Sequence, residues 1–422
     1  MTKSTPDGQI LRKIIAEIPT PFHLYDERVI REHARALNKA FAWNPGFREY
    51  FAVKATPNPY ILKILQQEGC GVDCASMTEL MLAEACGFKG EQIMFSSNMT
   101  PGEEFAYARK LGAIINLDDY THIDSLRENG GLPELVCLRF NPGGQFWVND
   151  SVMGTPVTSK FGMTERQIFD AIESLLTQNV KRFALHSFLA SNVLDMNYYP
   201  AIAHTLMELA LRIRQRFSIA VEMINLSGGV GIPYHPEEQA PDIQAIGDKV
   251  HETYHELIEQ NGMPHMRIST ELGRYMTGPA GYLVTTAIHE KDIYKHYIGL
   301  DASAVDLMRP AMYGSYHHIT VVDKEDAPCD TLYDVVGALC ENNDKFAVDR
   351  MLPHIDMGDI VLIHDTGAHG HSMGYNYNGK LRSPEVLLKE DGNFQMIRRR
   401  QTPEDYFDTL DFSGLLDGKM KD

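Results

Sequence analysis

Short apolar runs that alternate with helical stretches constrain the fold of this chain more than any other feature. Eight such runs occur, at residues 49–55, 70–75, 92–97, 112–118, 134–141, 182–188, 221–227 and 266–272. Between them, segments such as 59–67 and 198–217 carry apolar residues at the three- and four-residue spacing of a helix. Strands that alternate with helices form parallel sheets, and eight of them predict a closed, TIM-like (β/α)8 barrel. An open, doubly wound sheet is the alternative for this pattern.

The pattern changes after about residue 280, where strand-like segments follow one another with little helix between them. These segments are 281–290, 297–303, 317–323, 359–365 and 385–391. They predict a second domain that is rich in β structure, a β-barrel or sandwich. The segment TPFHLYD (20–26) is expected to join that sheet. We therefore expect an N-terminal segment (1–35) that joins the β domain, a barrel (36–280) and a C-terminal β domain (281–422).

Charge and composition exclude several classes of function. The formal net charge of −18 argues against a nucleic-acid partner, because phosphate contacts need clustered Lys and Arg. No apolar run reaches the roughly 18 residues of a membrane-spanning helix, so we expect no membrane partner. The six cysteines are scattered, and Cys70 and Cys74 have no neighbouring pair to complete a zinc site. We expect a reduced, cytoplasmic protein without a metal.

Polar residues gather at the carboxyl ends of the predicted strands, which is where (β/α)8 barrels carry their active sites. They are Lys54, Asp73, Arg139, His186, Ser191, the glycines within 228–231, Glu271 and Arg274. This alignment predicts an active site at that end of the barrel.

Lys54 follows the first predicted strand in the apolar context FAVKATPNP. An ammonium flanked by apolar side chains loses hydration, which makes the neutral amine available for a Schiff base. A surface lysine that carries no chemistry is the alternative.

A glycine cluster follows the strand at 221–227, and the next strand ends in Glu271-Leu-Gly-Arg274. Backbone N–H groups exposed by Gly228, Gly229 and Gly231, together with a guanidinium, suit a phosphate dianion. Glu271 suits a protonated ring nitrogen. A simple tight turn, and a structural ion pair between Glu271 and Arg274, are the alternatives.

Two further segments offer groups for a substrate. Arg309, with Tyr313 four residues on, suits bidentate binding of a carboxylate. Cys340 is a candidate proton donor and Glu341 a contact for an ammonium, whereas an inert buried thiol is the alternative for Cys340.

Together these segments make the chain resemble the fold-type III decarboxylases that depend on pyridoxal phosphate (PLP), and among them the diaminopimelate decarboxylases. The resemblance runs over nearly the whole length. It is carried by FAVKATPNP (51–59), VDCASMTEL (72–80), LRFNPG (138–143), SKFGM (159–163), HSFLAS (186–191), INLSGGVGIPY (224–234), ELGRY (271–275), LDASAVDLMRPAMYGSYHHI (300–319), CENND (340–344) and MGYNYNGKLRSPEVLL (373–388).

The resemblance implies an alanine-racemase-like fold and a set of roles for the site. Lys54 is expected to carry PLP as a Schiff base and Cys340 to donate the proton after CO2 leaves. The residues expected to contact or support the cofactor are Asp73, Arg139, His186, Phe188, Ser191, Gly228, Gly229, Glu271, Gly273, Arg274 and Tyr377. Those expected to hold the substrate are Arg274, Arg309, Tyr313, Glu341 and His369. The resemblance also implies a homodimer, with the Cys340 loop supplied by the partner subunit.

The expected reaction is decarboxylation of meso-2,6-diaminopimelate to L-lysine and CO2, the last step of lysine biosynthesis. Arg309 favours this substrate because diaminopimelate keeps a second carboxylate. The alternatives are another substrate (ornithine, arginine, a D-amino acid or a carrier-bound one), a racemase, and a catalytically silent binding homologue.

Four positions depart from the pattern of the family. Phe188 stands where a ring-stacking histidine is usual, and Ser227 where the glycine triplet usually begins. His369 replaces a tyrosine that touches cofactor and substrate, and Asn342 stands where Ser or Thr is usual. These departures concern the surroundings of the ring and the substrate.

Overall fold

The computed structural model describes residues 3, 5–145 and 155–412, which form two compact units. The first comprises Asp26–Gly281 together with Gly367–Ser372. The second comprises residues 5–25, Tyr282–Thr366 and residues 373–412. The short segment 367–372 therefore returns from the second unit to the first.

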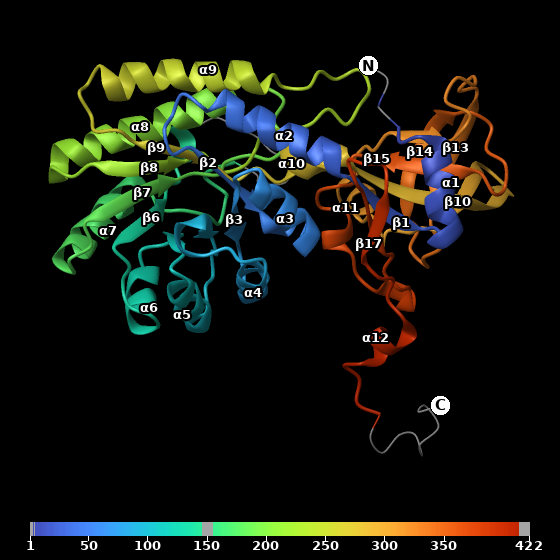
Figure 1. The fold of residues 1–422 in the computed structure, drawn as a ribbon, viewed down its shortest axis with the longest axis horizontal. Coiled ribbons are helices and arrows are strands. Elements are labelled where there is room, and N and C mark those ends of the chain that lie inside the picture. The colour runs from blue at the N-terminus through green and yellow to red at the C-terminus, as the bar shows by residue number, and fades with distance from the viewer. Residues whose placement is uncertain (1–2, 4, 146–154, 413–422) are drawn as a thin grey trace. The chain divides into compact units, whose positions relative to one another are not determined.

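The first unit contains a closed barrel of parallel strands (Figure 1). In order around the barrel they are β2 (Arg48–Ala52), β3 (Gly71–Cys74), β4 (Ile93–Phe95), β5 (Ile114–Leu117), β6 (Leu135–Arg139), β7 (Arg182–His186), β8 (Val221–Asn225) and β9 (Arg267–Thr270). Pairing of β2 with β9, Arg48 opposite Ser269, closes the ring. The predicted barrel is confirmed, and the open sheet is wrong.

Helices cover the outside of the barrel (Figure 1). They are α2 (Glu27–Ala40), α3 (Pro59–Gln67), α4 (Met77–Ala85), α5 (Gly102–Leu111), α6 (His122–Glu128), α7 (Glu165–Thr177), α8 (Tyr198–Phe217), α9 (Ile243–Tyr254) and α10 (Arg274–Thr277). With helices outside and side chains filling the inside, each strand is buried on both faces, which explains the nearly continuous apolar runs. Tyr50, Met94, Cys137 and Met223 belong to one buried cluster inside the barrel.

Local signals end the strands and begin the helices. Asn58 accepts a hydrogen bond from the N–H of Tyr60 at 3.0 Å, and Pro59 occupies the first turn of α3. Thr164 and Gln167 form a capping box at the start of α7. The segments after β2, β3, β4, β5 and β9 are short, whereas longer segments follow β6, β7 and β8.

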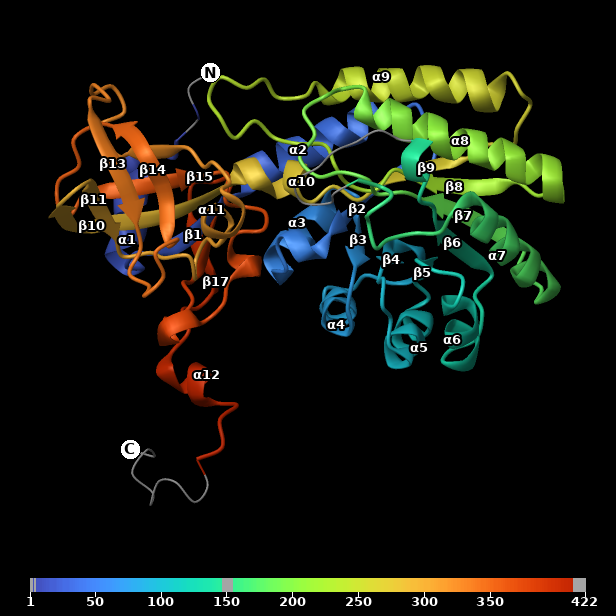
Figure 2. The same ribbon diagram turned by 180° about the vertical axis from the view of Figure 1, so that it is seen from behind.

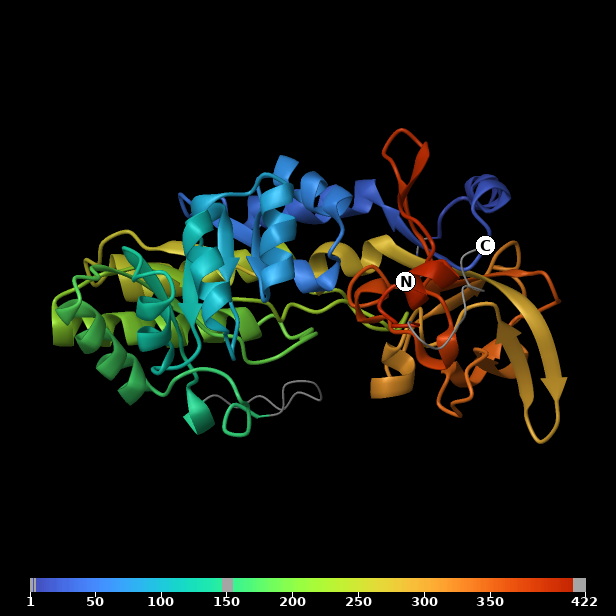
Figure 3. The same ribbon diagram turned by 90° about the horizontal axis from the view of Figure 1, so that it is seen from below.

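The second unit is built on a nine-stranded sheet (Figure 2). Its strands are β1 (Phe22–Asp26), β10 (Gly281–Asp292), β11 (His296–Leu300), β12 (Ile319–Val321), β13 (Thr331–Val336), β14 (Lys345–Leu352), β15 (Ile360–His364), β16 (Glu385–Leu388) and β17 (Phe394–Arg398). β1 lies between β10 and β16, so the segment 20–26 is part of this sheet. The antiparallel hairpin of β10 and β11 extends from it (Figure 3). Three helices accompany the sheet: α1 (Gly8–Glu17), α11 (Arg309–Tyr313) and α12 (Pro403–Phe407).

Among the described residues, no helix has the length and the apolar character that crossing a membrane would require.

One ionisable residue is built into the closure of the barrel. Glu49 of β2 is buried, and its carboxyl group accepts hydrogen bonds from the Thr270 hydroxyl and, at 2.7 Å, from the Leu272 N–H. Burial raises the pKa of Glu49 to about 8, because the hydrogen bonds do not fully offset the loss of hydration. Glu49 therefore links the stability of the barrel to pH.

We predict that Glu49→Gln reduces the fall in stability as pH rises. Between the unfolded pKa of about 4.3 and the folded value, the folded protein holds a proton that the unfolded chain releases, so the free energy of unfolding falls with pH. Urea titrations between about pH 5.5 and 7.5 measure the free energy of unfolding of both proteins. The difference in this free energy between wild type and variant should change by about 1 kcal/mol per pH unit. The exposed Glu252→Gln is the control, and an unchanged slope in Glu49→Gln would contradict the prediction.

Candidate active site

The barrel brings the polar strand ends to one face. In the parallel ladder, His186 is the register partner of both Arg139 and Asn225, and Asn225 is in turn opposite Ser269. Because all eight strands run in the same direction, their carboxyl ends meet at the same end of the barrel. The side chains that end β6, β7 and β8 are therefore neighbours there.

Glu271, which follows β9, is the centre of a hydrogen-bond network. His186 Nε2 lies 3.0 Å from its Oε2, and the Ser227 hydroxyl donates to the same oxygen at 2.8 Å. The Asn225 amide donates to Oε1 at 2.7 Å. Among the described residues Glu271 faces His186 and forms no ion pair with Arg274, so the alternative of a structural pair with Arg274 is wrong.

The two buried carboxyl groups of the site have opposite pKa shifts. Burial and the charge of Glu271 raise the pKa of Asp73 well above its ordinary value. Burial opposes ionisation of Glu271 as well, but the facing His186 and the hydroxyl of Ser227 outweigh it and lower the pKa of Glu271. The surroundings therefore favour ionisation of Glu271 and oppose ionisation of Asp73. Within the described part of the chain, Oδ1 of Asp73 is buried without a hydrogen-bond partner.

Lys54 lies in a single turn of 3-10 helix, η1 (Val53–Ala55), directly after β2. Its side chain is exposed, and Nζ lies 5.6 Å from the centre of the Phe188 ring. The expectation of an ammonium enclosed by apolar groups is therefore wrong. The reason is that β2 ends at Ala52, so Lys54 turns out of the ladder while Val53 and Ala55 stay buried.

A cradle of glycines lies beside Lys54. A Cβ atom on Gly228 would lie 2.9 Å from the Glu271 carbonyl oxygen, and one on Gly229 would lie 2.4 Å from the ring of Tyr198. A Cβ on Gly273 would lie 2.7 Å from the Cβ of Ala55. Side chains would collide with these atoms, so glycine allows the main chain to pack this closely where it lines the pocket.

Arg274, at the start of α10, supplies a buried cation to the same wall. Its guanidinium donates to the Tyr234 hydroxyl and, at 3.4 Å, to the hydroxyl of Ser191. Among the described residues no carboxylate pairs with Arg274, and its buried Nε has no hydrogen-bond partner. A buried, uncompensated guanidinium beside a glycine cradle fits a phosphate dianion.

These groups surround one pocket at the strand ends. It is lined by Ala52, Lys54, Asp73, Phe188, Ser191, Asn192, Ser227, Gly228, Gly229, Val230, Glu271, Leu272, Gly273, Arg274 and His369. An amine, an ionised carboxylate and a cationic cradle in one pocket fit the aldehyde, the ring nitrogen and the phosphate of PLP. Arg139 and His186 lie behind this lining, where Arg139 pairs with Asp118 at 2.9 Å and His186 holds Glu271.

Three of the four departures from the family pattern, Phe188, Ser227 and His369, line this pocket. His369 arrives with the segment 367–372, and its N–H donates to the Ala55 carbonyl at 2.9 Å. A Cβ on Gly367 would lie 1.9 Å from the Thr277 carbonyl oxygen, so a glycine is required for the segment to pack this closely.

The other predicted residues belong to the second unit. Arg309 begins α11 and is buried, and its guanidinium lies 5.6 Å from the ring of Tyr313, which is 41% exposed. Cys340 and Glu341 are exposed, so the alternative of an inert buried thiol is wrong for Cys340 in this chain. Tyr377 lies exposed in the short turn η7 (Tyr377–Gly379).

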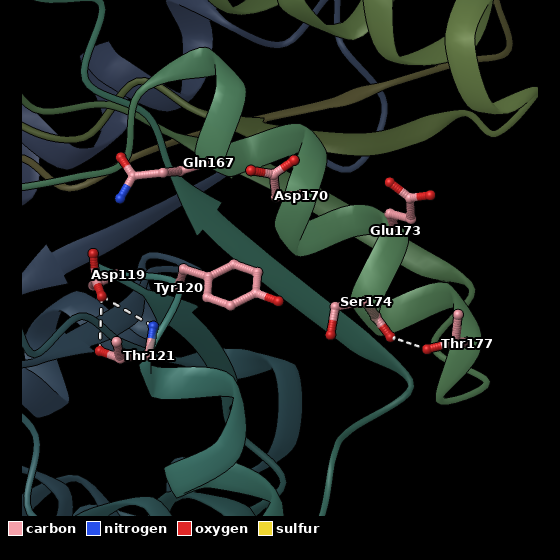
Figure 4. Close-up of a pocket in the computed structure, with 8 residues that line it drawn as sticks. All are labelled: Asp119, Tyr120, Thr121, Gln167, Asp170, Glu173, Ser174 and Thr177. Carbon is pink, nitrogen blue, oxygen red and sulfur yellow. Dashed lines mark hydrogen bonds between the residues drawn. The ribbon is translucent and has the colours of Figure 1, made fainter.

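A groove on the outside of the barrel is a separate feature (Figure 4). It lies between α7 and the segment after β5, and it is lined by Asp119, Tyr120, Thr121, Gln167, Asp170, Glu173, Ser174 and Thr177. It contains none of the predicted site residues. Across the described ranges, no group of three or more His, Cys, Asp or Glu side chains could hold a metal ion.

Sequence reasoning missed several residues of the site. Asn225 and Tyr234 hold Glu271 and Arg274, and Asp118 pairs with Arg139. Asn225 is the polar last residue of an apolar strand, the same signal that identified Arg139 and His186. Tyr234 has no such signal, because its contact with Arg274 joins the loop after β8 to the start of α10, which follows β9.

Comparison with known proteins agrees with this geometry. A family model described as pyridoxal-dependent decarboxylase, pyridoxal binding domain, matches residues 27–278. Protein TabA of Pseudomonas amygdali pv. tabaci is 41% identical, over 94% of this chain and 92% of the relative. The diaminopimelate decarboxylase of Methanothermobacter thermautotrophicus is 34% identical, over 92% of this chain and 91% of the relative.

A solved structure agrees in fold along nearly the whole chain. Diaminopimelate decarboxylase from M. jannaschii, in co-complex with L-lysine, matches with a TM-score of 0.85 at 26% identity and covers 96% of each chain. The chain therefore belongs to the pyridoxal-dependent decarboxylases: it is a PLP-dependent enzyme of the diaminopimelate decarboxylase family.

Proposed function

We propose that this enzyme removes the carboxyl group at the D-centre of meso-2,6-diaminopimelate and releases L-lysine and CO2. The observation that carries the proposal is the buried guanidinium of Arg309 beside the exposed Tyr313. Diaminopimelate keeps one carboxylate after the reaction, and a guanidinium binds a carboxylate through two parallel hydrogen bonds. The name of the relative from Methanothermobacter, and the L-lysine in the co-complex of the M. jannaschii enzyme, support the same substrate.

The residues of the strand-end pocket are proposed to hold the cofactor. Lys54 supplies the amine for the aldehyde, and Glu271 faces the ring nitrogen and holds a proton there. The phosphate site comprises Ser191, Gly228, Gly229, Gly273 and Arg274. Asp73 and Phe188 lie beside the ring, Arg139 and His186 support the carboxylates, and Tyr377 completes the cofactor site.

The chemistry requires a place for an electron pair and a source for one proton. PLP, when bound, accepts the electron pair that is left as the carbon–carbon bond to the carboxyl group breaks. The Cys340 thiol then delivers a proton to that carbon, and Glu341 holds the distal ammonium of the substrate. We propose that the Cys340 loop is supplied by the partner subunit of a homodimer, because Cys340 and Glu341 are exposed in the single chain.

Decarboxylation of another amino acid is the second candidate. Three of the departures, Phe188, Ser227 and His369, line the pocket itself. The relative at 41% identity also carries a different name from the diaminopimelate decarboxylases. This candidate retains the cofactor and the decarboxylation and changes only the substrate.

The proposal predicts one L-lysine for each CO2 released from meso-diaminopimelate by the purified protein with PLP. Lysine, ornithine and arginine are the competing substrates, and product identity is measured together with CO2. Lys54→Ala is the control, and it should lose both turnover and the visible absorbance of the bound cofactor. If the wild type shows the absorbance of bound cofactor but does not turn over diaminopimelate, the substrate assignment is contradicted and the cofactor assignment is retained.

Arg309→Ala should raise the KM for diaminopimelate about tenfold or more, because a charge-assisted pair with the distal carboxylate is lost. The affinity for PLP should not change. Arg309→Lys keeps the charge without the bidentate geometry, so its KM should lie between the values of the wild type and the alanine variant. Steady-state kinetics and a cofactor titration test this prediction, and an unchanged KM would remove Arg309 from the substrate site.

His369 should add a titration to the pH profile of kcat/KM. An imidazole ordinarily titrates near pH ~6.5, whereas a phenol titrates near pH ~10. His369→Tyr should therefore abolish a step in the histidine range. A profile with the same step in wild type and variant would assign the titration to another group.

A further inference from the structure

We infer that Ser227 is a positioning residue, whose hydroxyl orients the Glu271 carboxylate and keeps it the anionic partner of the cofactor's ring nitrogen. The inference rests on the proposed function, which places the ring nitrogen at Glu271. It adds a pocket residue whose hydroxyl acts on the cofactor through Glu271.

The backbone of Ser227 has a conformation that favours glycine. Its φ is +57°, in the left-handed region, and Gly228 and Gly229 follow directly. Hydrogen bonds hold it there: its N–H donates to the Asn225 side chain at 2.8 Å, and its carbonyl accepts from the Glu271 N–H at 2.8 Å. A residue with a Cβ is strained in this conformation. What serine adds over glycine at this position is its hydroxymethyl group.

That hydroxyl is aimed at Glu271. Ser227 Oγ donates to Oε2 at 2.8 Å, and His186 Nε2 lies 3.0 Å from the same oxygen. Both residues are buried, so water does not substitute for either contact. A carboxylate oxygen accepts about two hydrogen bonds, so Ser227 and His186 together fill Oε2.

The other oxygen keeps capacity for a ligand. Oε1 accepts from the Asn225 amide at 2.7 Å and has only a long contact, 3.5 Å, with the Ser96 hydroxyl. A ring N–H therefore has an acceptor site at Oε1. By fixing the rotation of the carboxylate and stabilising its charge, Ser227 favours a protonated ring nitrogen, which is the better electron sink.

If Ser227 were only a turn residue, loss of its hydroxyl would not affect Glu271. The chain offers a matched control for this alternative. Ser218 also has a φ of +57°, but it is exposed at the end of α8. Ser218→Gly and Ser227→Gly remove the same strain and the same atoms. Only the second also removes a hydrogen bond to Glu271.

The decisive measurement is the 15N chemical shift of the ring nitrogen in holoenzyme reconstituted with 15N-labelled PLP and without substrate. Glu271→Gln, which removes the charge, sets the scale. Ser227→Gly should move the resonance toward that of Glu271→Gln, whereas Ser218→Gly should match wild type. Ser227→Ala, which keeps the Cβ and loses the hydroxyl, should behave as Ser227→Gly and covers the case in which the glycine variant fails to fold.

Kinetics and stability provide the second readout. Ser227→Gly should lower kcat about tenfold while KM changes by less than about twofold, because a charge-assisted hydrogen bond is lost and no substrate contact is removed. Its Tm should stay close to that of wild type, since relief of backbone strain offsets the lost bond.

An unchanged 15N resonance and an unchanged kcat in both Ser227 variants would overturn the inference and leave Ser227 a turn residue. An unchanged resonance in Glu271→Gln would overturn it for another reason, because the ring nitrogen would then not face Glu271. The 15N resonance is recorded without substrate, so a failure of diaminopimelate as substrate is distinguishable from a failure of this inference.

Discussion

The pairing of β2 with β9 closes the barrel, and the position of every candidate catalytic group in the first unit depends on it. This contact joins the strand that leads into Lys54 to the strand that leads into Glu271. Glu49 strengthens the same seam, because its buried carboxyl group binds the Thr270 hydroxyl and the Leu272 N–H on either side of Glu271. The residues that close the barrel therefore also hold the chain on both sides of Glu271.

The charged groups of the pocket, Glu271, Arg274 and Lys54, lie at three separate positions. The ionised Glu271 is enclosed by donors from β7 and β8, and the uncompensated Arg274 lies among Ser191, Tyr234 and the glycine cradle. Lys54 lies at the rim with its side chain exposed. A single molecule that carries an aldehyde, a basic ring nitrogen and a phosphate has one matching group for each of these positions. This match between separate charges and separate groups supports the proposal that the pocket holds PLP.

Much of this could be predicted from the sequence, for physical reasons that differ between elements. The barrel strands were predictable because a parallel strand buried on both faces is a continuous apolar run. The positions of Arg139, His186 and Glu271 at the strand ends were predictable because a polar residue that ends such a run lies at the carboxyl end of the barrel, in the pocket or directly behind it. The exposure of Lys54 was left open, as the alternative of a surface lysine, and it follows from β2 ending at Ala52, three residues before the end of the apolar run 49–55.

What the sequence by itself determined is the order of the elements, the chemistry of the side chains and the end of the barrel at which they gather, because periodicity and strand polarity are local properties of the chain. Only the tertiary structure decided which donors meet which acceptors. Glu271 contacts His186 and not Arg274, and the Ser227 hydroxyl donates to the same carboxylate. His369 reaches the pocket from a segment between two strands of the second unit. The reason is distance along the chain. These contacts join residues far apart in sequence, so they depend on barrel closure and glycine-dependent close packing, which no local pattern encodes.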